Sequence, residues 1–132
     1  MNERDPFADW EVISGYSRAE AIADGVLIDL DGSGYEFVRR AEGIRVPTAI
    51  TRTLWLSVIG PEPADMGDDP EAAGRLMDLL RSFRTAARTN PHGNRVTWEF
   101  PALNGGTLSV ISVVGPGDDP RPVLTLTLPE DD

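Results

Sequence analysis

The spacing of hydrophobic positions changes along the chain. Between residues 70 and 89 apolar side chains recur at every third or fourth position, as in an amphipathic helix. After residue 94 they alternate with polar residues, as in strands with one buried face. Three such stretches follow one another with short links, at 95–103, 107–115 and 122–129. Three consecutive strands of this kind predict an antiparallel meander.

The residues from 17 to 25 have the signature of a compact helix. Ser17 can cap the first turn, and Glu20, three residues later, can bond back to it in a capping box. Gly25 supplies a residue that readily adopts the left-handed conformation at the helix exit. The apolar run at 26–30 that follows predicts a buried strand.

The same spacing of serine and glutamate recurs further along the chain. Ser33 and Glu36 predict a second capping box and a short helix over 33–43. Between 44 and 60, apolar residues at helical spacing and Pro47 near the start predict a third helix.

The long helix at 70–89 is expected to begin with Asp69 as its cap and Pro70 in its first turn, where a missing N–H costs nothing. These patterns predict an α+β fold. In it, helices from the first two-thirds pack on an antiparallel sheet built mainly from the C-terminal three-stranded meander. With 132 residues, we expect one domain over 1–132, a flexible N-terminal arm over 1–9 and a short extended segment at 10–16.

The stretch DLDGSG, which begins at Asp29, copies the first positions of an EF-hand calcium loop. Asp29, Asp31 and Ser33 would supply the first three ligands. The twelfth position requires a bidentate glutamate, but here it is Arg40, a cation. We therefore favour a helix start over a calcium site. A metal-dependent enzyme or calcium-binding factor that uses Asp29, Asp31 and Ser33 remains the alternative function.

Composition removes several kinds of chemistry. The chain has no cysteine and no lysine, which excludes disulfides, thiolate nucleophiles, cysteine-ligated zinc and Schiff-base lysines. Its single histidine, His92, lies in a predicted turn. Neither a serine nucleophile elbow nor a phosphate-binding glycine loop occurs. The sequence therefore predicts a protein that is not an enzyme and has no catalytic residues, no cofactor and no metal.

Charge provides the main functional indication. Twelve arginines oppose 22 acidic residues, for a net charge of -10, which disfavours direct binding to a nucleic acid backbone. No apolar run approaches the roughly 18 residues of a membrane span, and the N-terminus is unlike a secretory signal, so we expect a cytoplasmic protein that binds no membrane. Acidic residues gather in a loop, a turn and the C-terminal tail. They predict an interaction surface composed of Glu62, Asp65, Asp68, Asp69, Glu71, Asp118, Asp119, Glu130, Asp131 and Asp132.

Four stretches resemble a family of small acidic proteins of unknown function encoded on bacterial plasmids, phages and integrated elements. They read YSRAEAIADGVLIDL, GIRVPTAITRTLW, AGRLMDLL and VVGPGDDPRPVLTLTLPEDD, and the resemblance covers roughly residues 16–132. The run DLDGSGYEF departs from that family. The resemblance implies an accessory gene on a mobile genetic element and brings no catalytic residues with it.

Accessory genes of this kind include many anti-defence proteins, among them anti-CRISPR inhibitors. A negative surface can occupy a cationic channel that otherwise holds nucleic acid. We therefore expect a non-enzymatic interaction protein that offers an acidic surface to a basic host protein or nucleoprotein complex, the narrower form being an anti-CRISPR or other anti-defence inhibitor. An adaptor for plasmid maintenance is a further alternative, and the sequence leaves the oligomeric state open.

Overall fold

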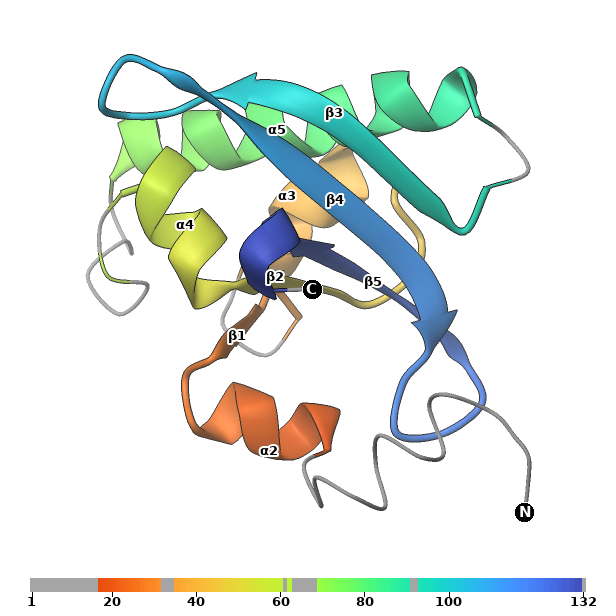
Figure 1. Ribbon diagram of the computed structural model, residues 1–132. Coiled ribbons are helices and arrows are strands. Elements are labelled where there is room, and N and C mark those ends of the chain that lie inside the picture. The colour runs from red at the N-terminus through yellow and green to blue at the C-terminus, as the bar shows by residue number, and fades with distance from the viewer. Residues whose placement is uncertain (1–16, 32–34, 61, 63–68, 91–92, 132) are drawn as a thin grey trace.

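The computed structural model describes residues 17–31, 35–60, 62, 69–90 and 93–131 (Figure 1). Within these residues the chain forms four α-helices, a short 3-10 helix and one five-stranded sheet. In chain order the elements are α2 (Arg18–Ala23), β1 (Leu27–Asp29), α3 (Glu36–Ala41), β2 (Thr48–Thr51), α4 (Arg52–Val58), α5 (Pro70–Arg88), β3 (Arg95–Pro101), β4 (Thr107–Pro116), β5 (Pro122–Thr127) and η2 (Pro129–Asp131).

The strands lie in the order β1-β2-β5-β4-β3. The predicted C-terminal meander is confirmed, because β3, β4 and β5 are consecutive antiparallel neighbours. Strand β2 adds to it in parallel with β5, and β1 pairs with β2 in the antiparallel sense. The sheet is therefore mixed, and its one parallel pairing joins β2 to the middle strand, β5.

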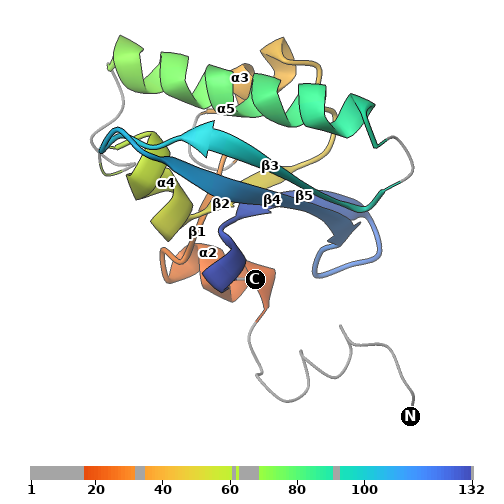
Figure 2. The ribbon, with the colours of Figure 1, turned by 45° about the horizontal axis from the view of Figure 1, so that its top comes forward.

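Helices cover the sheet from two sides. Helices α3 and α5 lie on one face, while α2 and η2 lie on the other (Figure 2). The predicted stripe of α5 is buried, since Leu76, Leu79 and Leu80 are fully inaccessible to solvent, and it belongs to the same core cluster as Val110 and Leu124 of the sheet. The α+β fold class is confirmed. The hydrophobic effect favours the burial of these side chains between α5 and the sheet.

The helix α2 forms as predicted, including both halves of its capping box. The Ser17 hydroxyl accepts a hydrogen bond from the Glu20 N–H at 3.0 Å, and the Ser17 N–H donates to Glu20 Oε1 at 2.9 Å. Gly25 ends the helix with φ at +81°, and the next residue, Val26, donates to the Ala21 carbonyl. This is a Schellman exit, which satisfies carbonyls that the helix itself leaves without donors.

The predicted start of the next helix is wrong. Helix α3 begins at Glu36, with Tyr35 as its N-cap and no side-chain capping bond, so Glu36 cannot act as the third residue of a box. Ser33 itself lies outside the described residues. Tyr35 is buried and packs on Trp55, with ring centroids 5.6 Å apart. The burial of this aromatic ring therefore accounts for where α3 begins better than a local cap does.

The helix predicted over 44–60 is also wrong in its first half. Residues Thr48–Thr51 form β2, and only Arg52–Val58 are helical. All four residues of β2 are buried, and the strand lies between β1 and β5. Pairing with two strands and burial on both faces outweigh the helical spacing of a few apolar side chains, and the β-branched residues of this segment suit a strand.

Several predictions fall on residues outside the described ranges. They are the N-terminal arm at 1–9, the extended segment at 10–16 and the position of His92. Among the helices that the structure describes, none has the length and apolar character needed to cross a membrane.

Candidate interaction surfaces

The turn between β4 and β5 contains Asp118, which the sequence predicts as part of an acidic interaction surface. Its carboxylate accepts hydrogen bonds from the N–H groups of Arg18 at 2.8 Å and of Ala19 at 3.0 Å. Asp118 thus caps the first turn of α2, where helix N–H groups are without intrahelical partners and the helix dipole favours a negative charge. It joins the last hairpin to the first described helix.

Asp119, the next residue, forms a local ion pair on the same turn. Its carboxylate accepts hydrogen bonds from the Arg121 N–H at 2.9 Å and from Arg121 Nε at 3.1 Å. These bonds to Arg121, the side-chain bond first, lower the pKa of Asp119 to about 2. The residue therefore stays ionised at every physiological pH, although its partner balances part of its charge.

A partly buried arginine lies beneath this turn, between α2 and the sheet. Arg18 donates from Nη1 to Thr125 Oγ1 at 2.7 Å and from Nη2 to the Leu124 carbonyl at 3.2 Å. Desolvation lowers the pKa of Arg18, while the nearby charges of Asp29 and Asp118 oppose that shift. The guanidinium is thus held by two hydrogen bonds to β5.

The acidic loop at 61–71 is described only in part, and Asp65 and Asp68 lie outside the described residues. Glu62 is exposed and forms an ion pair with Arg52 of α4. Asp69 caps α5 as predicted, because its Oδ1 accepts hydrogen bonds from the N–H groups of the second and third residues of that helix at 3.0 and 3.1 Å. Glu71 is exposed in the first turn of α5.

The predicted acidic tail begins in η2. Glu130 is exposed there, Asp131 ends the same short helix, and Asp132 lies outside the described residues. The short helix η2, to which Glu130 belongs, lies on the same side of the sheet as α2 (Figure 2).

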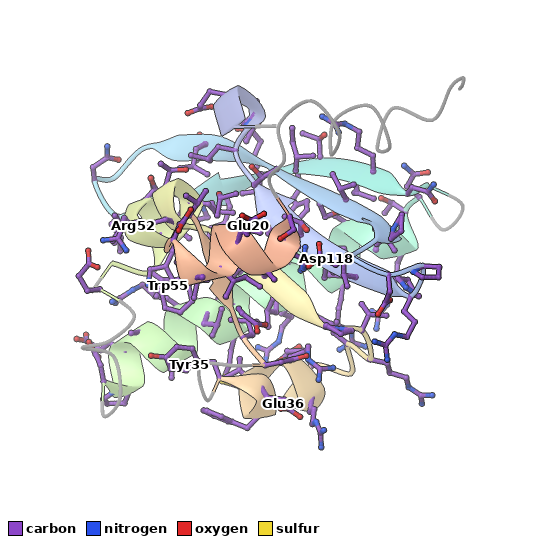
Figure 3. The ribbon with its side chains drawn as sticks, turned by 90° about the horizontal axis from the view of Figure 1, so that it is seen from below. Glu20, Tyr35, Glu36, Arg52, Trp55 and Asp118 are labelled. Carbon is purple, nitrogen blue, oxygen red and sulfur yellow. The ribbon has the colours of Figure 1, made fainter. Side chains whose placement is uncertain are left out.

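The fold thus gathers part of the predicted surface and separates the rest. We call the gathered part the acidic side, and Figure 3 shows two of its members, Glu20 on α2 and Asp118 beside that helix. All of its side chains are exposed. It consists of Glu20 and Asp24 of α2, Asp118 and Asp119 of the β4–β5 turn, and Glu130 of η2. Glu20 and Asp24 are members that the sequence reasoning missed.

On the other side of the sheet, a buried carboxylate holds two arginines of α5. Glu42, at the C-terminal end of α3, has a side chain only 6% exposed, and it accepts a hydrogen bond from Arg81 Nη2 at 2.9 Å. Arg84 Nη1 lies 3.6 Å from the same carboxylate. The bond from Arg81 is the main reason that the pKa of Glu42 is lowered. The sequence analysis missed this contact, because Glu42 and Arg81 are 39 positions apart.

Of the candidate metal ligands in the stretch DLDGSG, Asp31 forms an ion pair with an arginine. Asp31 Oδ1 accepts a hydrogen bond from Arg39 Nε at 2.8 Å, and Arg39 is buried, with Nη1 donating to the Ile44 carbonyl at 2.7 Å. Asp29 Oδ1 accepts the Asp31 N–H at 3.1 Å. Ser33 lies outside the described residues, and within the described part of the chain no group of three acidic or histidine side chains could hold a metal ion.

Comparison with known proteins gives one match. A family model described as a family of unknown function (DUF6573) matches residues 1–132. It indicates no enzyme family. No curated protein and no solved structure shows significant similarity to the chain.

Proposed function

We propose that this protein, which belongs to the DUF6573 family, is a non-enzymatic interaction factor that offers its acidic side to a basic host protein or nucleoprotein complex. The observation that carries the proposal is that five exposed carboxylates belong to three separate segments, α2, the β4–β5 turn bonded to it and η2, and that α2 and η2 lie on one side of the sheet. Charges from different elements that share one side add their potentials, which steers a cationic partner and selects against anionic ones.

The narrower proposal concerns the origin and target of the protein. We place the gene on a mobile genetic element, such as a plasmid or a phage, and the protein in the cytoplasm of the host. There it acts as an anti-CRISPR or other anti-defence inhibitor, by covering a cationic surface that would otherwise hold nucleic acid. The resemblance stated above and the net charge of -10 support this form.

Two charge-matched variants test which surface makes contact. The first neutralises three of the five carboxylates of the acidic side, with Asp24→Asn, Asp119→Asn and Glu130→Gln, and keeps Glu20 and Asp118, which cap α2. The second makes the same change in net charge elsewhere, with Glu62→Gln, Glu71→Gln and Asp78→Asn. Each replaces three carboxylates by amides, so a difference between them reports position and not total charge.

Each protein is immobilised and used to capture partners from a lysate of the bacterium that carries the gene, and the captured partner is then purified and titrated. We expect a basic partner that binds the wild type and the second variant, binds the first variant at least about tenfold more weakly, and is released at about 0.5 M salt, where charges are screened beyond a few ångströms. Equal binding by both variants, or loss in the second alone, would contradict the proposal.

A further inference from the structure

Strand β3 forms one edge of the sheet, and its backbone groups alternate between the neighbouring strand and the open side. The Val114 N–H donates to the Asn94 carbonyl at 2.8 Å, and the Ala102 N–H donates to the Gly106 carbonyl at 2.7 Å. With the register between the two strands, these bonds place the even-numbered residues of β3 in hydrogen-bonded pairs with β4. The N–H and C=O groups of the odd-numbered residues therefore point away from the sheet.

The outward groups of Thr97 and Glu99 have no partner among the residues that the structure describes. Both side chains are exposed as well. The opposite edge of the sheet is formed by β1, which is only three residues long. An open edge with unpaired donors and acceptors is a template on which another strand can add.

The face of β3 that carries its even-numbered side chains is covered by α5. Trp98 Nε1 donates to Ser82 Oγ at 2.9 Å, and its ring lies 6.0 Å from that of Phe83 between centroids. Both rings are only partly buried, although they belong to the border of the core. A strand placed beside β3 would therefore meet apolar surface with every second side chain.

The other face of β3 presents charges of opposite sign two positions on either side of Thr97. Arg95 precedes Thr97 by two residues, and Glu99 follows it by two. The Glu99 carboxylate accepts a hydrogen bond from Ser109 Oγ at 2.8 Å, which orients it on the sheet surface. In an antiparallel pair centred on Thr97, the incoming strand places an acidic residue opposite Arg95 and a basic residue opposite Glu99.

We propose that β3 binds an extended segment of a partner protein as an additional antiparallel strand, with the pattern basic, apolar, hydroxyl, apolar, acidic. Pro101 has no N–H to donate, so the binding edge is limited to about five residues around Thr97. A lone strand fits better than a second copy, which would bring its own α5 over the same edge (Figures 1 and 2). This edge is separate from the acidic side, so the inference goes beyond the proposed function and stands or fails independently of it.

Two synthetic peptides of the same composition test the predicted charge order. In antiparallel pairing, acetyl-Lys-Val-Thr-Val-Glu-amide places lysine opposite Glu99 and glutamate opposite Arg95, whereas acetyl-Glu-Val-Thr-Val-Lys-amide opposes like charges. Amide chemical shifts of the protein are followed by NMR during each titration. We expect shifts centred on Thr97 and Glu99, and a dissociation constant about fivefold lower for the first peptide. The double variant Arg95→Glu/Glu99→Arg should reverse the preference.

A pair of variants at one position tests the backbone pairing directly. Thr97→Pro removes an N–H that the ladder with β4 does not use, so the fold should persist while the peptide no longer binds. Thr97→Ala keeps the N–H and should bind the peptide within about twofold of wild type. The inference is overturned if Thr97→Pro binds as well as Thr97→Ala, or if neither peptide shifts β3 at millimolar concentration. It is also overturned if the amides of β3 become protected from exchange with rising protein concentration alone, because a second copy would then occupy the edge.

Discussion

Helices α2 and α3 are the same length and follow the same sequence signature, yet they begin in different ways. Each spans six residues, contains a glutamate that lies three positions after a serine, and has a glycine with positive φ two positions after its last residue. The capping box forms in α2, whereas α3 begins at Tyr35 with no capping bond. The comparison shows that a local signature fixes a helix start only where burial does not fix it first.

The burial of the two helices explains this difference. In α2 the only buried residue among those described is Ala21, so the caps from Ser17 and Asp118 carry much of its stability. In α3, Val38 and Arg39 are buried, and Tyr35 and Glu42 fix its two ends against α4 and α5. Packing stabilises α3, while hydrogen bonding at one end stabilises α2.

Removing the aromatic ring at the start of α3 should have the largest effect. Tyr35→Ala deletes a buried ring and leaves a cavity beside Trp55, so the free energy of unfolding should fall by about 3 kcal/mol. Phe37→Ala on the same helix is the control, because Phe37 is 61% exposed and should cost less than about 1 kcal/mol. Urea denaturation of both variants measures the difference. Equal losses would mean that burial of Tyr35 does not hold α3.

Replacing the buried arginine of α3, Arg39, should have the second largest effect on stability. Arg39→Met removes the donor to the Ile44 carbonyl and the partner of Asp31, which should lower the free energy of unfolding by about 2 kcal/mol. Arg40→Met is the matched control, since Arg40 pairs with Glu36 on the surface and its side chain is 70% exposed. That variant should lie within about 0.5 kcal/mol of wild type. A similar loss of unfolding free energy in both variants would mean that the stabilisation comes from net charge and not from the buried contacts of Arg39.

The two serines provide the most direct test of the signature. Ser17→Ala should lower the free energy of unfolding by about 1 kcal/mol, because it removes the oxygen that accepts the Glu20 N–H. Ser33→Ala should change it by less than about 0.5 kcal/mol, because α3 begins three residues later, at Glu36. Thermal and urea unfolding of the two variants side by side give the comparison. A loss at Ser33 as large as that at Ser17 would restore the second capping box.

Lowering the pH should destabilise α3 through Glu42, and we expect this effect to be smaller than those of the substitutions above. The hydrogen bond from Arg81 lowers the pKa of Glu42 in the folded protein below its ordinary value of 4.5. The stabilisation is therefore complete above about pH 4.5 and is lost as the pH falls through the lower, folded pKa. Amides of α3 should lose protection from hydrogen exchange over that range in the wild type. In Glu42→Gln they should change much less, and an identical profile would show that Glu42 does not hold α3 to α5.

Sequence reasoning succeeds here where the cause of a structure lies within a few residues. The start of α5 at Asp69, the capping box of α2 and the alternation in the meander are all of this kind, and all three form as predicted. It fails at β2, whose register depends on β1 and β5. It also misses the convergence of Arg81 and Glu42, because pairwise contacts between distant elements leave no periodic trace in one sequence.

The bond between Asp118 and the start of α2 spans 100 positions of the chain. During synthesis, the helix emerges from the ribosome long before its second cap has been translated. A six-residue helix has little stability by itself. The N–H groups of its first turn can therefore gain their bonds to Asp118 only when the final hairpin has formed. The first described element of the chain is thus among the last to reach its final hydrogen bonding. If translation ended before the codon for Asp118, the start of α2 would lack this carboxylate.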